Sequence, residues 1–170
     1  MSNAETAITR RIVSLVESII DLLDRVPHTL MALLGRFSIA AIFWQSGQTK
    51  VQNFAINIVS GEVTLGWPQL SDSVVDLFRD EYALPLIPPE FAAVAAAFAE
   101  HTFPLLILIG LATRFSALAL LGMTATIQLF VYPDAYPTHG VWAAVLLWLV
   151  ARGPGALSLD HLIAKRYGNA

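Results

Sequence analysis

The sequence has 170 residues, of which 56% are hydrophobic and 14% are charged, and its formal net charge is −3. An average soluble domain carries about 25% charged residues, and the mean hydropathy here is +0.63. These values predict one integral membrane domain. The sequence has no basic tract, which argues against nucleic acid as a partner, and no cysteine, which excludes disulfides, thiolate chemistry, iron–sulfur ligation and Cys-based zinc sites.

The N-terminal segment, residues 1–27, predicts an interfacial amphipathic helix. Over residues 5–26, polar positions recur every three to four residues and aliphatic side chains fill the other face. Glu17, Asp21, Asp24 and Arg25 make the segment too charged to cross a bilayer, and they also argue against a cleavable signal. Pro27 ends the predicted helix.

Four apolar segments in residues 28–152 are predicted to cross a bilayer, which takes 17–25 residues, although the fourth is short. They are expected at about residues 28–45, 89–112, 115–132 and 138–151. The predicted fold class is all-α: a four-helix transmembrane bundle with N- and C-terminal interfacial amphipathic helices. The short link at Thr113 and Arg114 makes the second and third spans antiparallel neighbours.

The two remaining segments are predicted to lie outside the lipid. Residues 51–88 are rich in Gly, Pro and Asp, and they predict an extracytoplasmic cap with a short helix over 73–79; loops of this length are often functional. Residues 153–170 predict a cytoplasmic interfacial segment in which Ser158 caps a helix over 159–167.

Basic residues outside the predicted spans give the orientation. Seven are expected on one side, Arg10, Arg11, Arg25, Arg114, Arg152, Lys165 and Arg166, and two on the other, Lys50 and Arg79. The positive-inside rule then places both termini in the cytoplasm and the cap outside. Arg114 and Arg152 are predicted to anchor the inner face to lipid phosphates.

Two charges of opposite sign fall inside predicted spans. Arg36 lies in the first and Glu100 in the second, at depths that a long guanidinium can bridge, and an unpaired charge there costs several kcal/mol. We therefore predict an Arg36–Glu100 ion pair, either purely structural or part of a relay or ligand site. Side chains lean toward the N-terminus of their helix, which pulls these two apart and leaves a bridging water or another group as the alternative.

Further polar side chains predict an outward-facing pocket in the bundle. Thr124, Gln128 and Tyr132 form a stripe at a spacing of four, and a membrane Gln is also a common interhelical hydrogen bonder. The predicted pocket residues are Gln45, Gln48, His101, Thr124, Gln128, Tyr132, His139 and Trp142. No spacing of metal ligands, dinucleotide fingerprint or nucleophile elbow is present, so neither a metal nor a cofactor is indicated by motif.

The chain resembles the DoxX family of small bacterial inner-membrane proteins over about residues 28–163. The matching features are Arg36, the run Phe43-Trp44-Gln45-Ser46-Gly47-Gln48-Thr49-Lys50, Glu100-His101 with Pro104, Gly110-Leu111-Ala112-Thr113-Arg114, Phe130-Val131-Tyr132-Pro133, His139, Trp142, Gly153-Pro154-Gly155 and Ser158-Leu159-Asp160. The N-terminal helix and the 51–88 cap are less typical of the family.

The resemblance implies four spans and a cytoplasmic-membrane location. Some DoxX proteins resemble the membrane subunit of a thiosulfate:quinone oxidoreductase, and others are linked to a membrane assembly with superoxide dismutase and a sulfurtransferase. Our interpretation is a non-enzymatic accessory component, embedded in the bilayer, of a redox or oxidative-stress assembly with a redox-protein partner. One alternative is a quinone-binding oxidoreductase subunit in which Gln128, Tyr132 or His101 holds the quinone head. Another is a small-solute or metal-ion transporter, working as a homo-oligomer.

Overall fold

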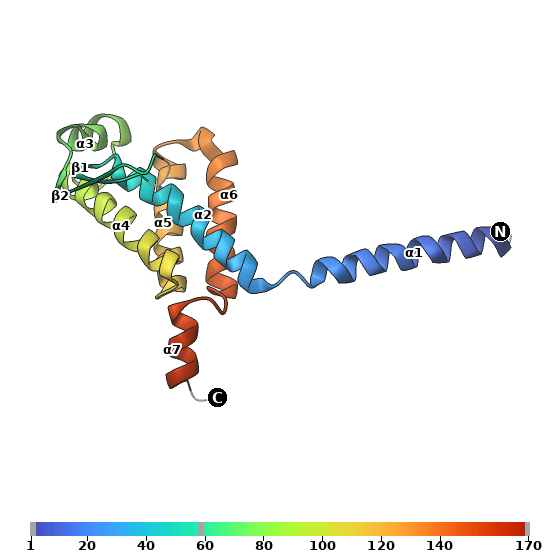
Figure 1. Cartoon of the computed structure of the whole chain (residues 1–170). Helices are drawn as coiled ribbons and strands as arrows, with labels where there is room; N and C mark the ends of the chain where they lie inside the picture. Colours follow the sequence, from blue (N-terminus) through green and yellow to red (C-terminus); the bar gives the residue numbers. More distant parts are fainter. Residues whose placement is uncertain (1–2, 58–59, 169–170) are drawn as a thin grey trace.

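The computed structural model describes residues 3–57 and 60–168, and in this part the chain is mostly helical (Figure 1). The helices are α1 Asn3–Asp24, α2 His28–Gln48, α3 Asp72–Asp76, the π-helical η1 Leu77–Tyr82, α4 Pro89–Ile109, α5 Thr113–Phe130, the 3-10 turn η2 Pro133–Ala135, α6 Tyr136–Arg152 and α7 Leu159–Tyr167. The bounds of α7 are those predicted, and those of α1, α2, α4, α5 and α6 differ from the predictions by a few residues.

Four helices, α2, α4, α5 and α6, pack side by side as the body of the molecule. α2 packs on α4, α4 on α5, α5 on α6, and α6 back on α2. The buried core includes Ile39 and Phe43 of α2, Ile107 of α4, Leu120 of α5 and Leu146 of α6. The predicted tight link between α4 and α5 is confirmed: Gly110 and Ala112 both adopt left-handed backbone conformations there.

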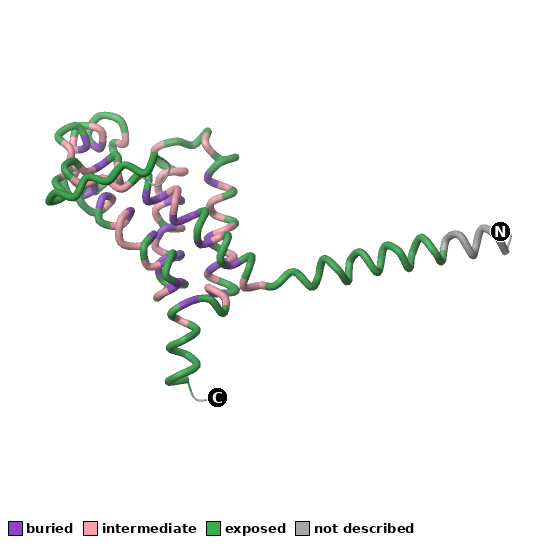
Figure 2. The backbone as a smooth tube through the Cα atoms, viewed as in Figure 1, coloured by how far each residue is buried: buried purple, intermediate pink, exposed green. Residues whose placement is uncertain are grey.

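Large apolar side chains cover the outside of this body, whereas several polar ones are buried inside it. Figure 2 shows where buried and exposed residues lie along the backbone. The exposed ones include Leu30, Leu34 and Phe37 of α2, Val94, Phe98 and Leu105 of α4, Phe115 and Leu118 of α5, and Val141 and Leu147 of α6. Contiguous apolar surface of this kind is unusual on a water-soluble monomer. Among the described residues, α2 and α4 are long and apolar enough to cross a membrane.

The segment between α2 and α4 contains a β-hairpin as well as a helix, so the all-α prediction was wrong for this segment. β1 Val51–Ile56 pairs antiparallel with β2 Val63–Leu70, with a bulge at Asn53. Gly66 lies against the bulge, where a Cβ would come within 2.3 Å of the Asn53 carbonyl oxygen. The hairpin was missed because Gly66 and Pro68 interrupt the β2 pattern.

The predicted short helix of this cap continues further than expected, as α3 followed by η1. Val74 and Phe78 are buried against Ala92 and Ala93 of α4, so these helices fold down onto the end of the body. The hairpin, α3 and η1 lie at one end of the molecule, and α1 and α7 leave from the other end (Figure 1).

α1 runs away from the body without packing on it (Figure 1). All of its residues from Arg10 onward are exposed. They include a broad aliphatic set: Ile12, Val13, Leu15, Val16, Ile19, Ile20, Leu22 and Leu23. Its amphipathic pattern is the predicted one, and the body does not cover its apolar face.

Candidate functional site

Arg36 is buried near the end of the body from which α7 leaves, and it binds backbone carbonyls rather than Glu100. Its Nε donates to Ile107 O at 2.8 Å and one terminal nitrogen to Leu108 O at 2.5 Å, both at the C-terminal end of α4. The other terminal nitrogen donates to Pro154 O at 3.1 Å and Leu157 O at 2.6 Å. The guanidinium therefore ties α2 to α4 and to the loop before α7.

Glu100 forms its ion pair with Lys50, 2.7 Å away, and the predicted Arg36–Glu100 pair was wrong. Lys50 is 4% exposed and Glu100 is 3% exposed. The direction in which side chains lean accounts for the outcome. Glu100 leans toward the cap and Arg36 leans toward the opposite end of the body, whereas Lys50 lies in the turn just after α2, near Glu100.

Close contact between α2 and α4 surrounds this ion pair. The Lys50 ammonium also donates to the hydroxyl of Ser46 at 3.2 Å and to its carbonyl at 3.3 Å. Gly47 faces α4, where an added Cβ would lie 3.1 Å from the Glu100 Cβ and 3.0 Å from the His101 ring. A larger residue at position 47 would push the two helices apart.

A cavity of about 290 Å³ lies beside Glu100, between α4, α5 and the cap. Its lining is mostly apolar, and the polar side chains that reach it include Ser46, Tyr82 and Glu100. Ser46 and Tyr82 were absent from the predicted pocket, because neither looks unusual in the sequence.

The predicted outward pocket is divided between separate hydrogen-bonded groups, so its eight residues do not share one cavity. In the first group, Gln48 donates to His101 Nε2 at 2.9 Å and accepts from the Ile56 backbone N–H at 2.7 Å. His101 Nδ1 donates to Ala97 O at 2.7 Å, which leaves Nε2 as the acceptor. This chain of bonds joins β1 to α2 and α4. Gln45 is exposed beside Gln48.

The second group lies where α5 meets α6. His139 Nδ1 donates to Gln128 Oε1 at 2.8 Å, and Gln128 donates to Pro133 O at 2.5 Å. The Trp142 ring lies 5.1 Å from the His139 ring. Thr124 is buried and donates to Leu120 O of its own helix at 2.8 Å. Gln128 therefore acts here as an interhelical hydrogen bonder.

Tyr132 belongs to a third group, in which the cap meets the end of α5. Its hydroxyl donates to the Glu81 carboxylate, and its ring meets Tyr82 edge-on at 5.8 Å. The bond to Glu81 raises the pKa of Tyr132, because the adjacent carboxylate opposes a phenolate. Burial raises the pKa of Tyr82 for a related reason, the cost of a desolvated charge.

The two predicted lipid anchors differ in their surroundings. Arg114 donates to Val150 O and, at 3.0 Å, to Ala151 O, so it caps the C-terminal end of α6. Arg152 is exposed. Asp160, which was not among the predicted site residues, accepts from the backbone N–H groups of Ala112 and Thr113 at 2.7 and 2.9 Å and so caps α5. Ser158 caps α7 as predicted, accepting from His161 N.

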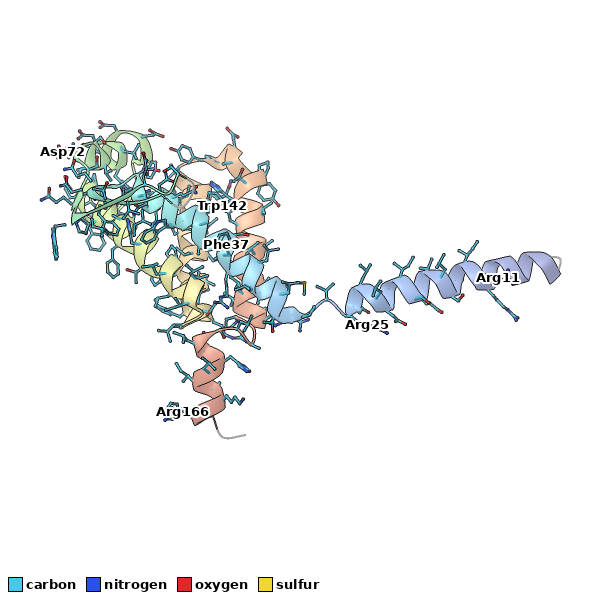
Figure 3. The ribbon with its side chains drawn as sticks, viewed as in Figure 1. Arg11, Arg25, Phe37, Asp72, Trp142 and Arg166 are labelled. Carbon is cyan, nitrogen blue, oxygen red and sulfur yellow. The ribbon has the colours of Figure 1, made fainter. Side chains whose placement is uncertain are left out.

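Figure 3 labels charged residues at both ends of the molecule. Arg11 lies on α1, Arg25 directly follows α1 and Arg166 lies on α7, whereas Asp72 lies on the cap at the other end. Within residues 3–57 and 60–168, no group of three or more His, Cys, Asp or Glu side chains is placed to hold a metal ion.

An apolar helical body whose buried charges are paired or hydrogen-bonded internally is characteristic of one class, the helical membrane proteins. The DoxX family model matches residues 31–133, from α2 to the start of η2, and the chain belongs to the DoxX family of membrane proteins. The match stops before α6, which joins the same body through its contacts with α5 and α2.

A relative from Haemophilus influenzae, described as an uncharacterized protein, is 33% identical over 99 residues. The aligned region covers 52% of this chain and 66% of the relative, slightly less than two thirds of its length. No solved structure matches.

Proposed function

We propose that this protein crosses the bacterial cytoplasmic membrane four times, through α2, α4, α5 and α6, with both termini in the cytoplasm. α5 and α6 have 18 and 17 residues, at the lower end of the length needed to span a bilayer. Their exposed Phe115, Leu118, Val141 and Leu147 support a lipid-facing surface. α1 and α7 then lie at the cytoplasmic interface, where their apolar faces meet the acyl boundary.

Cysteine labelling tests this orientation, because the natural sequence has no cysteine. Ser73→Cys lies on the exposed side of α3 and Ala156→Cys in the exposed loop before α7. In intact cells an impermeant maleimide should label the first and spare the second, and after permeabilisation it should label both. The reverse pattern in intact cells contradicts the orientation.

We propose further that the protein is an accessory component of a redox or oxidative-stress assembly rather than an enzyme in its own right. The observation that carries this is the internal satisfaction of its buried charges. Arg36 is held by four carbonyls and Lys50 by Glu100, an arrangement suited to holding helices in place. The quinone alternative has three single candidate residues, Gln128, Tyr132 and His101, and each of them already has a hydrogen-bond partner within the protein.

The cap is the proposed contact with the partner, because its hairpin presents large apolar side chains beyond the body. Leu65 and Trp67 of β2 are 77% and 84% exposed. The test is purification of the tagged chain from its native membranes in mild detergent, with assays for superoxide dismutase and sulfurtransferase activity. One of these should co-purify, and Leu65→Ser with Trp67→Ser should abolish it.

A matched control replaces two exposed apolar residues at the opposite end, Leu162→Ser with Ile163→Ser on α7. This variant should retain the partner activity. The accessory proposal fails when neither activity accompanies the wild-type protein, or when the cap and α7 variants lose it equally.

A further inference from the structure

The cavity beside Glu100 has the composition of a small-molecule site. Its volume of about 290 Å³ lies at the lower end of the range for ligand pockets, which are mostly apolar with a few placed polar groups. None of the eight residues predicted from sequence for a pocket lines it, whereas Glu100, predicted for an ion pair, does. It is also separate from the exposed face of the hairpin proposed to meet a partner.

The walls of this cavity favour a flat ring. On the α4 side the lining is short, with Ala92, Ala95, Ala96 and Ala99. On the cap side it is aromatic, with Phe78 and Tyr82, whose rings meet edge-on at 4.7 Å. A planar apolar molecule can lie along the alanine wall and meet the aromatic side chains in edge or offset contacts, which are the preferred aromatic geometries.

Glu100 determines which hydrogen-bonding group a ligand in this cavity must carry. Its carboxylate accepts hydrogen bonds and donates none when ionised, and with two oxygens it has about four acceptor positions. Lys50 contacts one oxygen at 2.7 Å, and the carboxylate retains further acceptor capacity. A ligand group that reaches Glu100 must therefore bring a donor hydrogen.

We propose that this cavity binds a small, planar, mostly apolar molecule that carries a hydroxyl group, a phenol-like compound. The ring lies between the alanine wall of α4 and the side chains of Phe78 and Tyr82. The hydroxyl donates to Glu100.

The test uses the purified full-length protein in lipid nanodiscs and 2-naphthol as the probe, with bound probe measured by equilibrium dialysis. Empty nanodiscs give the partition into lipid. Wild type should bind one further, saturable equivalent of 2-naphthol. The donor-free analogue 2-methoxynaphthalene should bind at least about tenfold more weakly, because it cannot donate a hydrogen bond to the Glu100 carboxylate.

Variants that fill the cavity provide the structural arm of the test. Ala96→Phe and, at an exposed position of the lining, Ala95→Phe should abolish saturable binding. Ala144→Phe, at an exposed position of α6, should leave it unchanged. Because Ala95 is exposed, its replacement keeps the test valid even when Ala96→Phe fails to fold.

The double variant Lys50→Met with Glu100→Met isolates the polar requirement, since it removes both charges together. It should bind the two probes equally. Absence of saturable 2-naphthol binding by wild type overturns the proposal, as does binding that survives Ala95→Phe. Equal affinity of wild type for the two probes also overturns it and identifies the space as an apolar gap suited to a lipid chain. Each outcome is independent of whether a partner enzyme co-purifies.

Discussion

The Glu100 carboxylate and the Lys50 ammonium neutralise each other in a nearly water-free position. Removing one partner of such a pair leaves an uncompensated buried charge and typically costs about 3–5 kcal/mol, whereas replacing both with apolar residues is often neutral. Glu100→Ala should therefore lower the free energy of unfolding by about that amount. The double variant Lys50→Met with Glu100→Met should recover most of the loss.

Reversible unfolding in detergent measures this cycle. Glu90→Ala is the matched control, because Glu90 forms an exposed ion pair with Arg79 at 3.1 Å and exposed pairs contribute little to stability. Equal effects of Glu100→Ala and Glu90→Ala would contradict the assignment of the Lys50–Glu100 pair as a buried support.

Arg36 depends on the shape of its side chain as much as on its charge. Its guanidinium reaches four carbonyls in two segments, and lysine, with one ammonium, cannot reproduce that fork. Arg36→Lys should lower the free energy of unfolding by at least about 2 kcal/mol, because hydrogen bonds to charged groups contribute about 1.5–3 kcal/mol each. Amide exchange at residues 155–158 should quicken. Arg152→Lys, at an exposed position, should change neither quantity.

Among the elements, the cap is held to α5 and η2 by the Tyr132–Glu81 bond. The pKa of Tyr132 is raised, so the bond contributes fully below the ordinary tyrosine pKa of about 10 and is lost as pH rises through the higher folded value. In an absorbance titration of tyrosinate, Tyr132→Phe should remove a component that titrates well above pH 10. Tyr136→Phe should leave that component in place. A late component that persists in Tyr132→Phe would show that the bond to Glu81 does not govern the ionisation of Tyr132.

The helices of the chain could be predicted from sequence, but the cap could not. Apolar runs bounded by Pro27, Pro89 and the Thr113-Arg114 link predicted α2, α4 and α5 within a few residues, and Ser158 predicted the start of α7. The hairpin depends on pairing between short, irregular segments, and η1 on packing against Ala92 and Ala93, neither of which leaves a periodic signal.

The site could be predicted as a set of residues more readily than as a set of contacts. Arg36 and Glu100 were identified because charge in an apolar run is conspicuous. Their partners are backbone carbonyls and a lysine at the end of a helix, which are inconspicuous in a sequence. Their similar depth along the helices predicted that Arg36 and Glu100 would pair. In the structure the two side chains point apart, because each leans toward the N-terminus of its own helix.

For the whole molecule, α1 contributes nothing to the packing of the body in the described part of the chain. Deleting residues 1–26 should leave the melting temperature in detergent unchanged, because no buried contact is lost. Trypsin should cut at Arg10, Arg11 and Arg25 rapidly in detergent and slowly in liposomes, where the interface covers the apolar face of α1. Equal cleavage rates at Arg11 in the two environments would argue against an interfacial α1.

The four acceptors of Arg36 are made at very different times. Pro154 and Leu157 follow it by 118 and 121 residues, so the ribosome produces the cation long before half of its acceptors exist. Until then, water or the insertion machinery must solvate the nascent guanidinium. The contacts that hold α2, the first helix of the body to be synthesised, are therefore complete only after the loop before α7 has been made. The last step in the assembly of the body thus depends on the C-terminal part of the chain.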